Sequence, residues 1–150
     1  MNIVPLYGRL FSQAVPDHRS ENVEIREAIG VVSEGVRNRG IWVMDRGGDK
    51  AYLYNYLMAS ELRFLLRVRG DQGLRSAQGI EPVVDLARGC PMLFDETVVK
   101  EEAGHERLLH LECGRRKVRL PDRREELTLV VVKGFGEEPL MIPFSSLPIA

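Results

Sequence analysis

The alternation of hydrophobic and polar positions predicts two strands in the first half of the chain. Phe64, Leu66 and Val68 alternate with a largely basic set of side chains, which is typical of a strand with one buried face. The members of that second set are Arg63, Leu65, Arg67 and Arg69. The run Ile41–Met44 is apolar at every position, as expected of a short strand covered on both faces.

Two helices and a further strand are predicted around these runs. One apolar stripe recurs at helical spacing between Ser20, an N-cap residue, and Gly40. Its members are Ile25, Ala28, Ile29, Val32 and Val36. A second helix is expected after Asp49, with Tyr52, Leu53, Tyr56 and Leu57 on its apolar face. Ile3–Phe11 is predicted to be a strand in which Pro5 favours an edge position. Residues 1–69 therefore predict an α/β fold in the order β-α-β-α-β, with a mixed or parallel sheet.

The second half of the chain is predicted to be rich in β-structure. Residues 70–79 are polar and predict a loop, and Val83–Ala87 predicts a short helical turn that ends near Gly89. Strands are predicted over residues 96–100, 107–113, 117–120 and 127–133, with Gly104, Gly114 and Pro121–Asp122 in the turns between them. Residues 70–126 are thus expected to form a β-rich segment, and residues 127–150 to return toward the core predicted for residues 1–69.

Composition sets limits on the classes of function. The chain has 150 residues, which is enough for one domain with a core, and its net charge of −1 gives no global attraction to nucleic acid or anionic lipid. Cys90 and Cys113 show no CxxC spacing, which favours a reducing compartment. There is no apolar run of about 20 residues and no secretory signal, so we expect a cytoplasmic protein without membrane contact.

Asp45 is the strongest candidate for chemistry. It directly follows the apolar strand Ile41–Met44, and open α/β sheets bind ligands at the carboxyl ends of their strands. A carboxylate at that edge suits a hard cation such as Mg²⁺ or Mn²⁺. The alternative is an Asx turn in which Asp45 accepts hydrogen bonds from the amides of Gly47 and Gly48. Asp17 and Asp49 are weaker substitutes, because Asp17 lies in a Pro-containing loop and Asp49 is an N-cap residue.

Five segments of the chain resemble, in order, the DDE-type transposases of bacterial insertion sequences. The segments are Pro5–Ser12, Ser20–Asn22, Gly40–Asp49, Arg63–Arg67 and Leu129–Gly136. The most specific is the Asp-Arg-Gly sequence that begins at Asp45, between an apolar strand and a helix, with Ser-Glu-Asn upstream. The resemblance is to the branch whose RNase-H-like core is interrupted by a β-rich insertion. It implies a partial RNase-H-like core in residues 1–69, followed by that insertion.

The resemblance also implies an activity and a metal requirement. Such enzymes cut double-stranded DNA at transposon ends and join the freed 3′-hydroxyl to a target strand. Three carboxylates hold two Mg²⁺ or Mn²⁺ ions for this chemistry. Asp45 matches the second carboxylate, as both metal ligand and catalytic residue. The family's first aspartate lies upstream of the segment that matches Pro5–Ser12, and its glutamate lies on a helix after the β-rich insertion. We therefore expect this chain to be a transposase fragment that is catalytically incomplete alone and binds metal weakly or not at all.

Basic residues supply the candidates for DNA contacts, because guanidinium groups suit phosphate. They are Arg46, Arg67, Arg69, Arg115, Arg116 and Lys117, with Arg119 beside the last three. Arg46 has the alternative of a salt bridge. The others have the alternative of a solvated face of mixed charge, since many glutamates share their half of the chain.

Tyr52, Tyr56 and Trp42 are predicted to pack in or near the core rather than to stack on bases. An alternative function is a non-catalytic module that binds DNA, regulates or pairs with an intact transposase, or forms a homo-oligomer. The exposed sheet edge of a partial core would favour such pairing.

Overall fold

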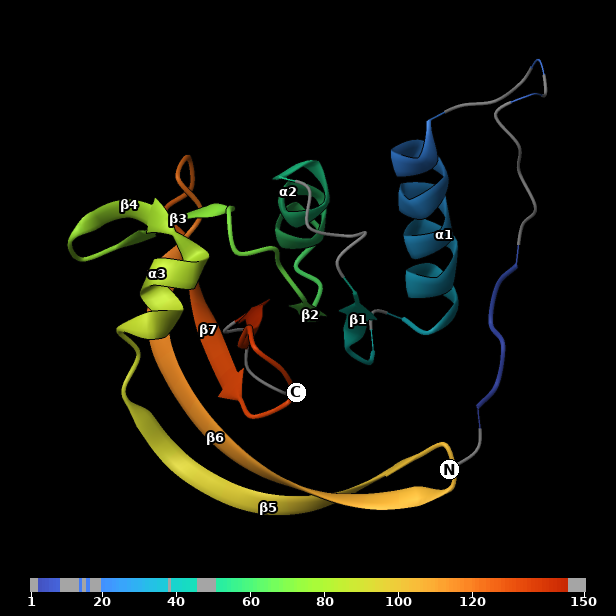
Figure 1. Cartoon of the computed structure of the whole chain (residues 1–150). Helices are drawn as coiled ribbons and strands as arrows, with labels where there is room; N and C mark the ends of the chain where they lie inside the picture. Colours follow the sequence, from blue (N-terminus) through green and yellow to red (C-terminus); the bar gives the residue numbers. More distant parts are fainter. Residues whose placement is uncertain are drawn as a thin grey trace.

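The computed structural model describes residues 3–8, 14, 16, 20–37, 39–45 and 51–145. This part of the chain contains three helices and one eight-stranded sheet, whose arrangement is drawn in Figure 1. The helices are α1 (Glu21–Gly35), α2 (Ala51–Ala59) and α3 (Val83–Arg88). The strands are β1 (Trp42–Met44), β2 (Phe64–Leu66), β3 (Gly73–Ser76), β4 (Gly79–Pro82), β5 (Met92–Glu102), β6 (His105–Arg119), β7 (Glu126–Lys133) and β8 (Leu140–Ser145).

The sheet is mixed and mostly antiparallel, so the chain has an α/β fold. Its strand order is β1-β2-β8-β7-β6-β3-β4, and β5 pairs with β6 outside this path. β1 and β2 are parallel, with Trp42 opposite Phe64, and α2 makes the crossover between them. The other strand pairs are antiparallel. A parallel pair joined by a helix places the ends of β1 and β2 at the same edge of the sheet.

All three helices pack on one face of the sheet, which we call the core face. Ile29 of α1, Leu57 of α2 and Leu86 of α3 share one buried cluster with the core-face residues of the strands. Those strand residues include Phe64, Leu66, Leu74, Val118, Leu127, Leu129, Val131 and Met141. Tyr54 of α2 lies edge-on to Phe64, with 5.7 Å between ring centroids. The alternation predicted for Phe64, Leu66 and Val68 is thus confirmed, since all three are buried.

The opposite side of the same strands, which we call the open face, is covered far less. Around β1, β2 and β8 its apolar residues include Ile41, Val43, Leu65, Val130, Ile142 and Phe144, and all of these are half-buried or exposed. Shallow clefts of about 400 Å³ and about 250 Å³ lie among them. The prediction that Ile41–Met44 is covered on both faces is wrong, because Ile41 is 51% exposed and Val43 is 71% exposed. No helix of the described residues places its buried residues on this face.

β5 and β6 continue past the rest of the sheet as a two-stranded arm, residues 96–111. β6 pairs with β7 from Glu112 to Arg119, whereas its earlier residues pair with β5 alone. In the view of Figure 1 the arm curves beneath the rest of the molecule, with its concave side toward it. Val99 and Leu108 form a cross-strand pair on its outer surface, and both are exposed. Leu109 and Leu111 of β6 are buried, however, so burial of these two side chains supports the arm in addition to its own ladder.

In the first half, the predicted strand and helix boundaries need correction. Residues 3–8 of the predicted strand Ile3–Phe11 form no strand, because no described strand lies beside them and Pro5 has no N–H for a ladder. α1 ends at Gly35 rather than at Gly40, and Arg37 then adopts a left-handed φ of 53°. Asp49, the predicted N-cap of α2, lies outside the described residues.

In the second half, the predicted loop and one predicted turn are strands. Residues 70–79 contain β3, which pairs with β4 as a hairpin. Gly114 lies inside β6 and not in a turn. The position suits glycine because a Cβ there would overlap the carbonyl oxygen of Pro91 and would crowd the sulfur of Cys90. Its lack of a side chain serves close packing of two chain segments, not a change of direction. The short helix predicted over Val83–Ala87 is confirmed as α3.

Candidate functional site

The structure places Asp45 at the sheet edge predicted for it. It directly follows Met44, the last residue of β1, and its side chain is 74% exposed. Arg67 directly follows the parallel strand β2, and its Nη1 donates a hydrogen bond of 3.3 Å to Oδ1 of Asp45. The two side chains meet because parallel neighbours end at one edge and both lie on the open-face side. Asp45 is therefore a solvent-facing carboxylate with a cationic neighbour.

The surface beside this ion pair is a shallow cleft of about 250 Å³. Its lining joins Asp45 and Arg67 to apolar residues of the open face, namely Val43, Leu65 and Ile142. Pockets that bury a small organic ligand usually measure roughly 300–1,000 Å³. The cleft thus suits contact with a larger partner or a small ion better than enclosure of a metabolite.

The described residues do not complete a two-metal site around Asp45. They contain no group of three or more His, Cys, Asp or Glu side chains arranged to hold a metal ion. Asp17 and Asp49, the suggested substitutes, lie outside the described residues, as do Gly47 and Gly48 of the proposed Asx turn. A single exposed carboxylate can hold a divalent cation only weakly, and the guanidinium of Arg67 competes for the same oxygen.

The candidates for DNA contact near Asp45 are engaged in ion pairs. Arg69, two positions beyond Arg67, is 3.3 Å from Asp71, and both side chains are mostly exposed. Arg46 lies outside the described residues. Exposed pairs of this kind are weak, so phosphate could displace either carboxylate at small cost.

The predicted basic cluster on β6 divides between the two faces of the sheet. Arg115 and Lys117 are exposed, whereas Arg116 between them is half-buried on the core-face side. There its Nη1 donates a hydrogen bond of 3.1 Å to the carbonyl oxygen of Leu86. Arg116 thus anchors the end of α3 to β6, since alternate residues of a strand point to opposite faces.

Two further cations extend the exposed side of this cluster. Arg119 continues the row of Arg115 and Lys117, and Arg75 of β3 is its register partner. A groove of about 290 Å³ lies between Arg75, Lys117 and Arg119. Glu126 also lines it and is 3.0 Å from Nζ of Lys117, so the face carries mixed charge. The sequence does not point to Arg75 as part of this cluster, because residues 70–79 predict a loop. A loop has no regular face, so the side of the sheet on which Arg75 lies could not be predicted.

The aromatic residues lie mainly against other side chains. Trp42 and Tyr56 are half-buried and pack on the core cluster, as predicted. Tyr52 is more exposed than the predicted apolar face of α2 implies, because α2 turns Leu53, Tyr54 and Leu57 inward instead. Arg26 of α1 lies 5.0 Å above the ring of Tyr56, and a hydrogen bond with Tyr52 is the main cause that raises the pKa of this guanidinium.

In comparisons with known proteins, the chain matches no family model and no curated protein. Within the described residues, no helix has the length and hydrophobicity that a bilayer crossing requires.

Proposed function

We propose that this chain is a portion of a DDE-type transposase, with an RNase-H-like core that includes β1, α2 and β2. Asp45 is its metal-binding carboxylate and double-stranded DNA is its substrate class. The observation that carries the proposal is the position of Asp45, exposed at the carboxyl end of β1 beside a parallel neighbour. The order of the five family-like segments along the sequence supports the same assignment.

The proposal assigns no complete catalytic centre to this chain alone. Two-metal phosphoryl transfer needs several carboxylates that converge on the ions, and the described residues contain no group of three or more His, Cys, Asp or Glu side chains arranged to hold a metal ion. In the intact enzyme, Asp45 would be one of three ligands for Mg²⁺ or Mn²⁺. Arg67 would hold the carboxylate at the rim until a metal ion replaces the guanidinium.

Paramagnetic broadening by Mn²⁺ tests the assignment of Asp45, because it detects millimolar binding. In an isotope-labelled sample we expect the amide signals of Met44 and Arg67 to broaden before most others. Asp45→Asn should abolish this preference. Asp71→Asn is the matched control, because Asp71 is equally exposed and is also 3.3 Å from an arginine. If broadening near Met44 is unchanged in Asp45→Asn, the assignment is wrong.

A nicking assay on supercoiled DNA tests whether the catalytic centre of this chain is incomplete. The purified chain with Mg²⁺ or Mn²⁺ should leave the DNA intact. Robust cleavage by this chain that disappears in Asp45→Ala would show a complete centre and would overturn this part of the proposal.

A second candidate function is DNA binding without catalysis, and one observation favours it. Arg75, Arg115, Lys117 and Arg119 gather on one side of β3 and β6, although the net charge of the chain is near zero. Contacts to phosphate release counterions, so affinity should fall steeply with salt. Arg75→Ala with Arg115→Ala should weaken binding of a DNA duplex, whereas Arg88→Ala on α3 should not. Equal binding by all variants, or none at low salt, would exclude this function.

A further inference from the structure

β1 presents an open edge of backbone groups. On its inner side, the N–H of Trp42 donates to the carbonyl oxygen of Arg63 at 2.9 Å, and the carbonyl oxygen of Met44 accepts from the N–H of Arg67 at 3.0 Å. Val43 lies between these residues, so its own N–H and C=O point away from β2. Within the described part of the chain, no strand pairs with this outer edge. Such an edge is a template for another strand.

This edge lacks the features that protect the other sheet edges. Proteins usually blunt an edge strand with charge, proline or a bulge. The edge strand β4 carries Glu81 and Pro82, and β5 is rich in acidic residues along the arm. β1 instead exposes Ile41 and Val43, and its neighbours Leu65 and Ile142 continue the apolar surface inward. An added strand would therefore gain hydrogen bonds and apolar contact together.

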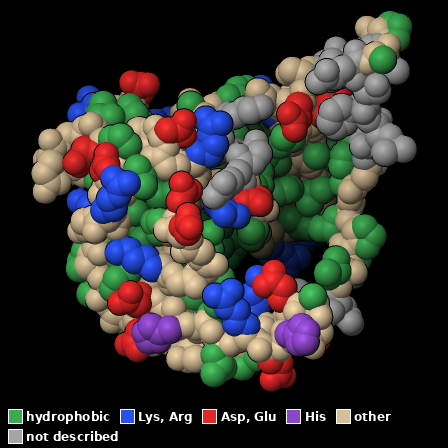
Figure 2. Space-filling view, viewed as in Figure 1, with side chains coloured by type: hydrophobic (Ala, Val, Ile, Leu, Met, Phe, Trp, Pro, Cys, Tyr) green, Lys and Arg blue, Asp and Glu red, His purple; other side chains and the backbone are tan. Residues whose placement is uncertain are grey.

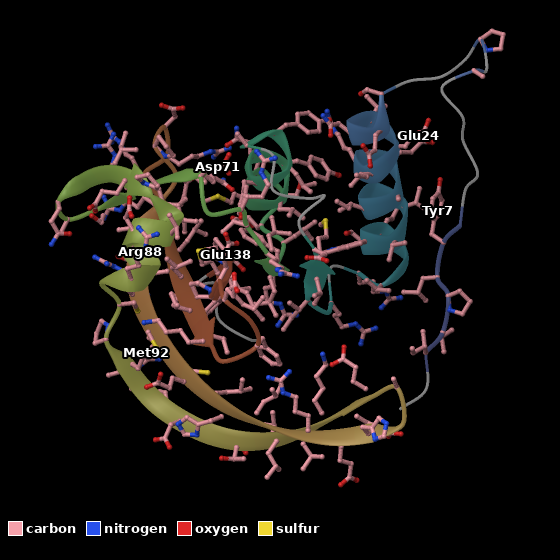
Figure 3. All side chains as sticks on the ribbon, in the orientation of Figure 1. Tyr7, Glu24, Asp71, Arg88, Met92 and Glu138 are labelled. Atoms are coloured by element: carbon pink, nitrogen blue, oxygen red, sulfur yellow. The ribbon has the colours of Figure 1, made fainter. Side chains whose placement is uncertain are left out.

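The same chain contains a segment with the pattern of a strand and no partner strand. Ile3–Gly8 is extended in outline, and Ile3, Val4 and Leu6 are 85%, 69% and 66% exposed. Figure 1 traces this segment past the outer side of α1, and Figure 3 places Tyr7 there, well apart from β1. Six residues in a strand span about 20 Å, which is an ordinary strand length and enough to cover β1 with its flanks.

We propose that residues 3–8 of one copy of this chain add as an edge strand beside β1 of a second copy, and that the exchange is reciprocal. A second copy is favoured as the partner because residues 3–8 lie on the outer side of α1 in their own chain. Exchange between two copies pairs both the open edge of β1 and residues 3–8 without moving α1. One symmetric dimer then contains two identical strand additions. In Figure 2, hydrophobic side chains border the hollow to the right of centre, above the β5–β6 arm, and an added strand would lie on this side of β1.

Pro5 fixes the register of this contact. An edge strand directs the N–H of every second residue at its one neighbour, and Pro5 has no N–H to offer. Pro5 therefore faces outward, and Val4 and Leu6 direct their N–H groups at β1. The proposal thus requires protection of the Val43, Val4 and Leu6 amides from hydrogen exchange, and none for Tyr7.

Light scattering after gel filtration, from about 5 µM to about 500 µM of the full chain, measures the association. We expect a dimer, with a dissociation constant that rises at least about tenfold in Val43→Lys and in Leu6→Pro. Val99→Lys is the control for the first variant, because Val99 is an exposed valine on β5, away from this edge. Tyr7→Pro is the control for the second, because its N–H points outward in the proposed register. Both controls should remain dimeric.

Mixing the two disruptive variants sharpens the test, because one edge and one segment are then intact. The Val43→Lys chain supplies a normal segment and the Leu6→Pro chain supplies a normal β1, so the mixture should associate more tightly than either variant alone. A monomeric wild-type chain at every concentration would overturn the proposal. So would a dimer that both variants leave unchanged, or a monomer whose Val43 amide loses protection in Leu6→Pro, which would mean pairing within one chain.

Discussion

The two faces of the sheet are made by neighbouring residues of the same strands, yet their surroundings differ strongly. Leu66 is fully buried beneath the helices, whereas Leu65, the preceding residue, is half-buried beside a shallow cleft. The apolar sequence of β1 and β2 does not reveal this difference, since both faces carry hydrophobic side chains. An apolar run thus indicates that a face can be covered, while the arrangement of helices decides which face is.

The largest effect should come from a matched pair of substitutions on β2. Leu66→Ala removes a fully buried side chain and should lower the free energy of unfolding by about 2–5 kcal/mol. Leu65→Ala makes the same chemical change on the open face and should cost less than about 1 kcal/mol. Urea unfolding measures both values. Equal losses would mean that the open face is as well covered as the core face.

A smaller effect is expected where two segments cross without room for a side chain. Gly114→Ala places a methyl group against the Pro91 carbonyl and the Cys90 sulfur, and should destabilise the fold by about 1–3 kcal/mol. Gly136→Ala is the control, because an added Cβ there meets nothing within 4 Å. Thermal unfolding measures the stability of both variants. Equal losses of stability would contradict the close approach of Gly114 to Pro91 and Cys90.

The two cysteines offer a chemical probe of the same contrast. Cys90 is buried in the core cluster, and burial raises the pKa of its thiol, whereas Cys113 is half-buried on β6. A raised pKa leaves less thiolate at a given pH, so labelling of Cys90 near pH 8 should be at least about tenfold slower than in urea and should speed up as pH rises. Single-thiol variants Cys113→Ser and Cys90→Ser separate the two rates. Equal rates for folded and unfolded Cys90 would contradict its burial.

The smallest effect should come from the ion pair at the rim. Asp45→Asn removes the charge that faces Arg67, and because the carboxylate is largely exposed, the free energy of unfolding should change by less than about 1 kcal/mol. The change should shrink further at high salt. A loss of several kcal/mol would show that Asp45 serves the fold rather than a partner.

The elements whose pattern depends on one local rule are predictable from the sequence. The alternation of Phe64, Leu66 and Val68, the helical stripe through Ile29 and the short helix α3 all follow from burial on one side of a regular element. The location of Asp45 at the end of a strand was predictable for the same reason, because an apolar run that stops at a charged residue marks the limit of burial.

What the sequence could not show depends on contacts between distant segments. Gly114 suggests a turn when only its neighbours are considered, and its close approach to Pro91 becomes visible only when β5 and β6 are paired. Arg115, Arg116 and Lys117 form one cluster along the chain but divide between two faces once β6 is a continuous strand. Residues 3–8 have a strand pattern, but a strand also needs a neighbour, and the described chain supplies none.

The narrow connection between β2 and β8 has a consequence for the order of folding. The two strands share the single register pair Leu65 and Phe144, supported by a hydrogen bond from the Phe64 N–H to Oγ of Ser145 across 81 positions of sequence. The β5–β6 hairpin needs only a tight local turn to begin. Because closing a long loop costs more entropy than closing a short one, the hairpin should form early and the β2–β8 connection late. The same connection is then the line along which the molecule would first separate into a helical half and a β-rich half.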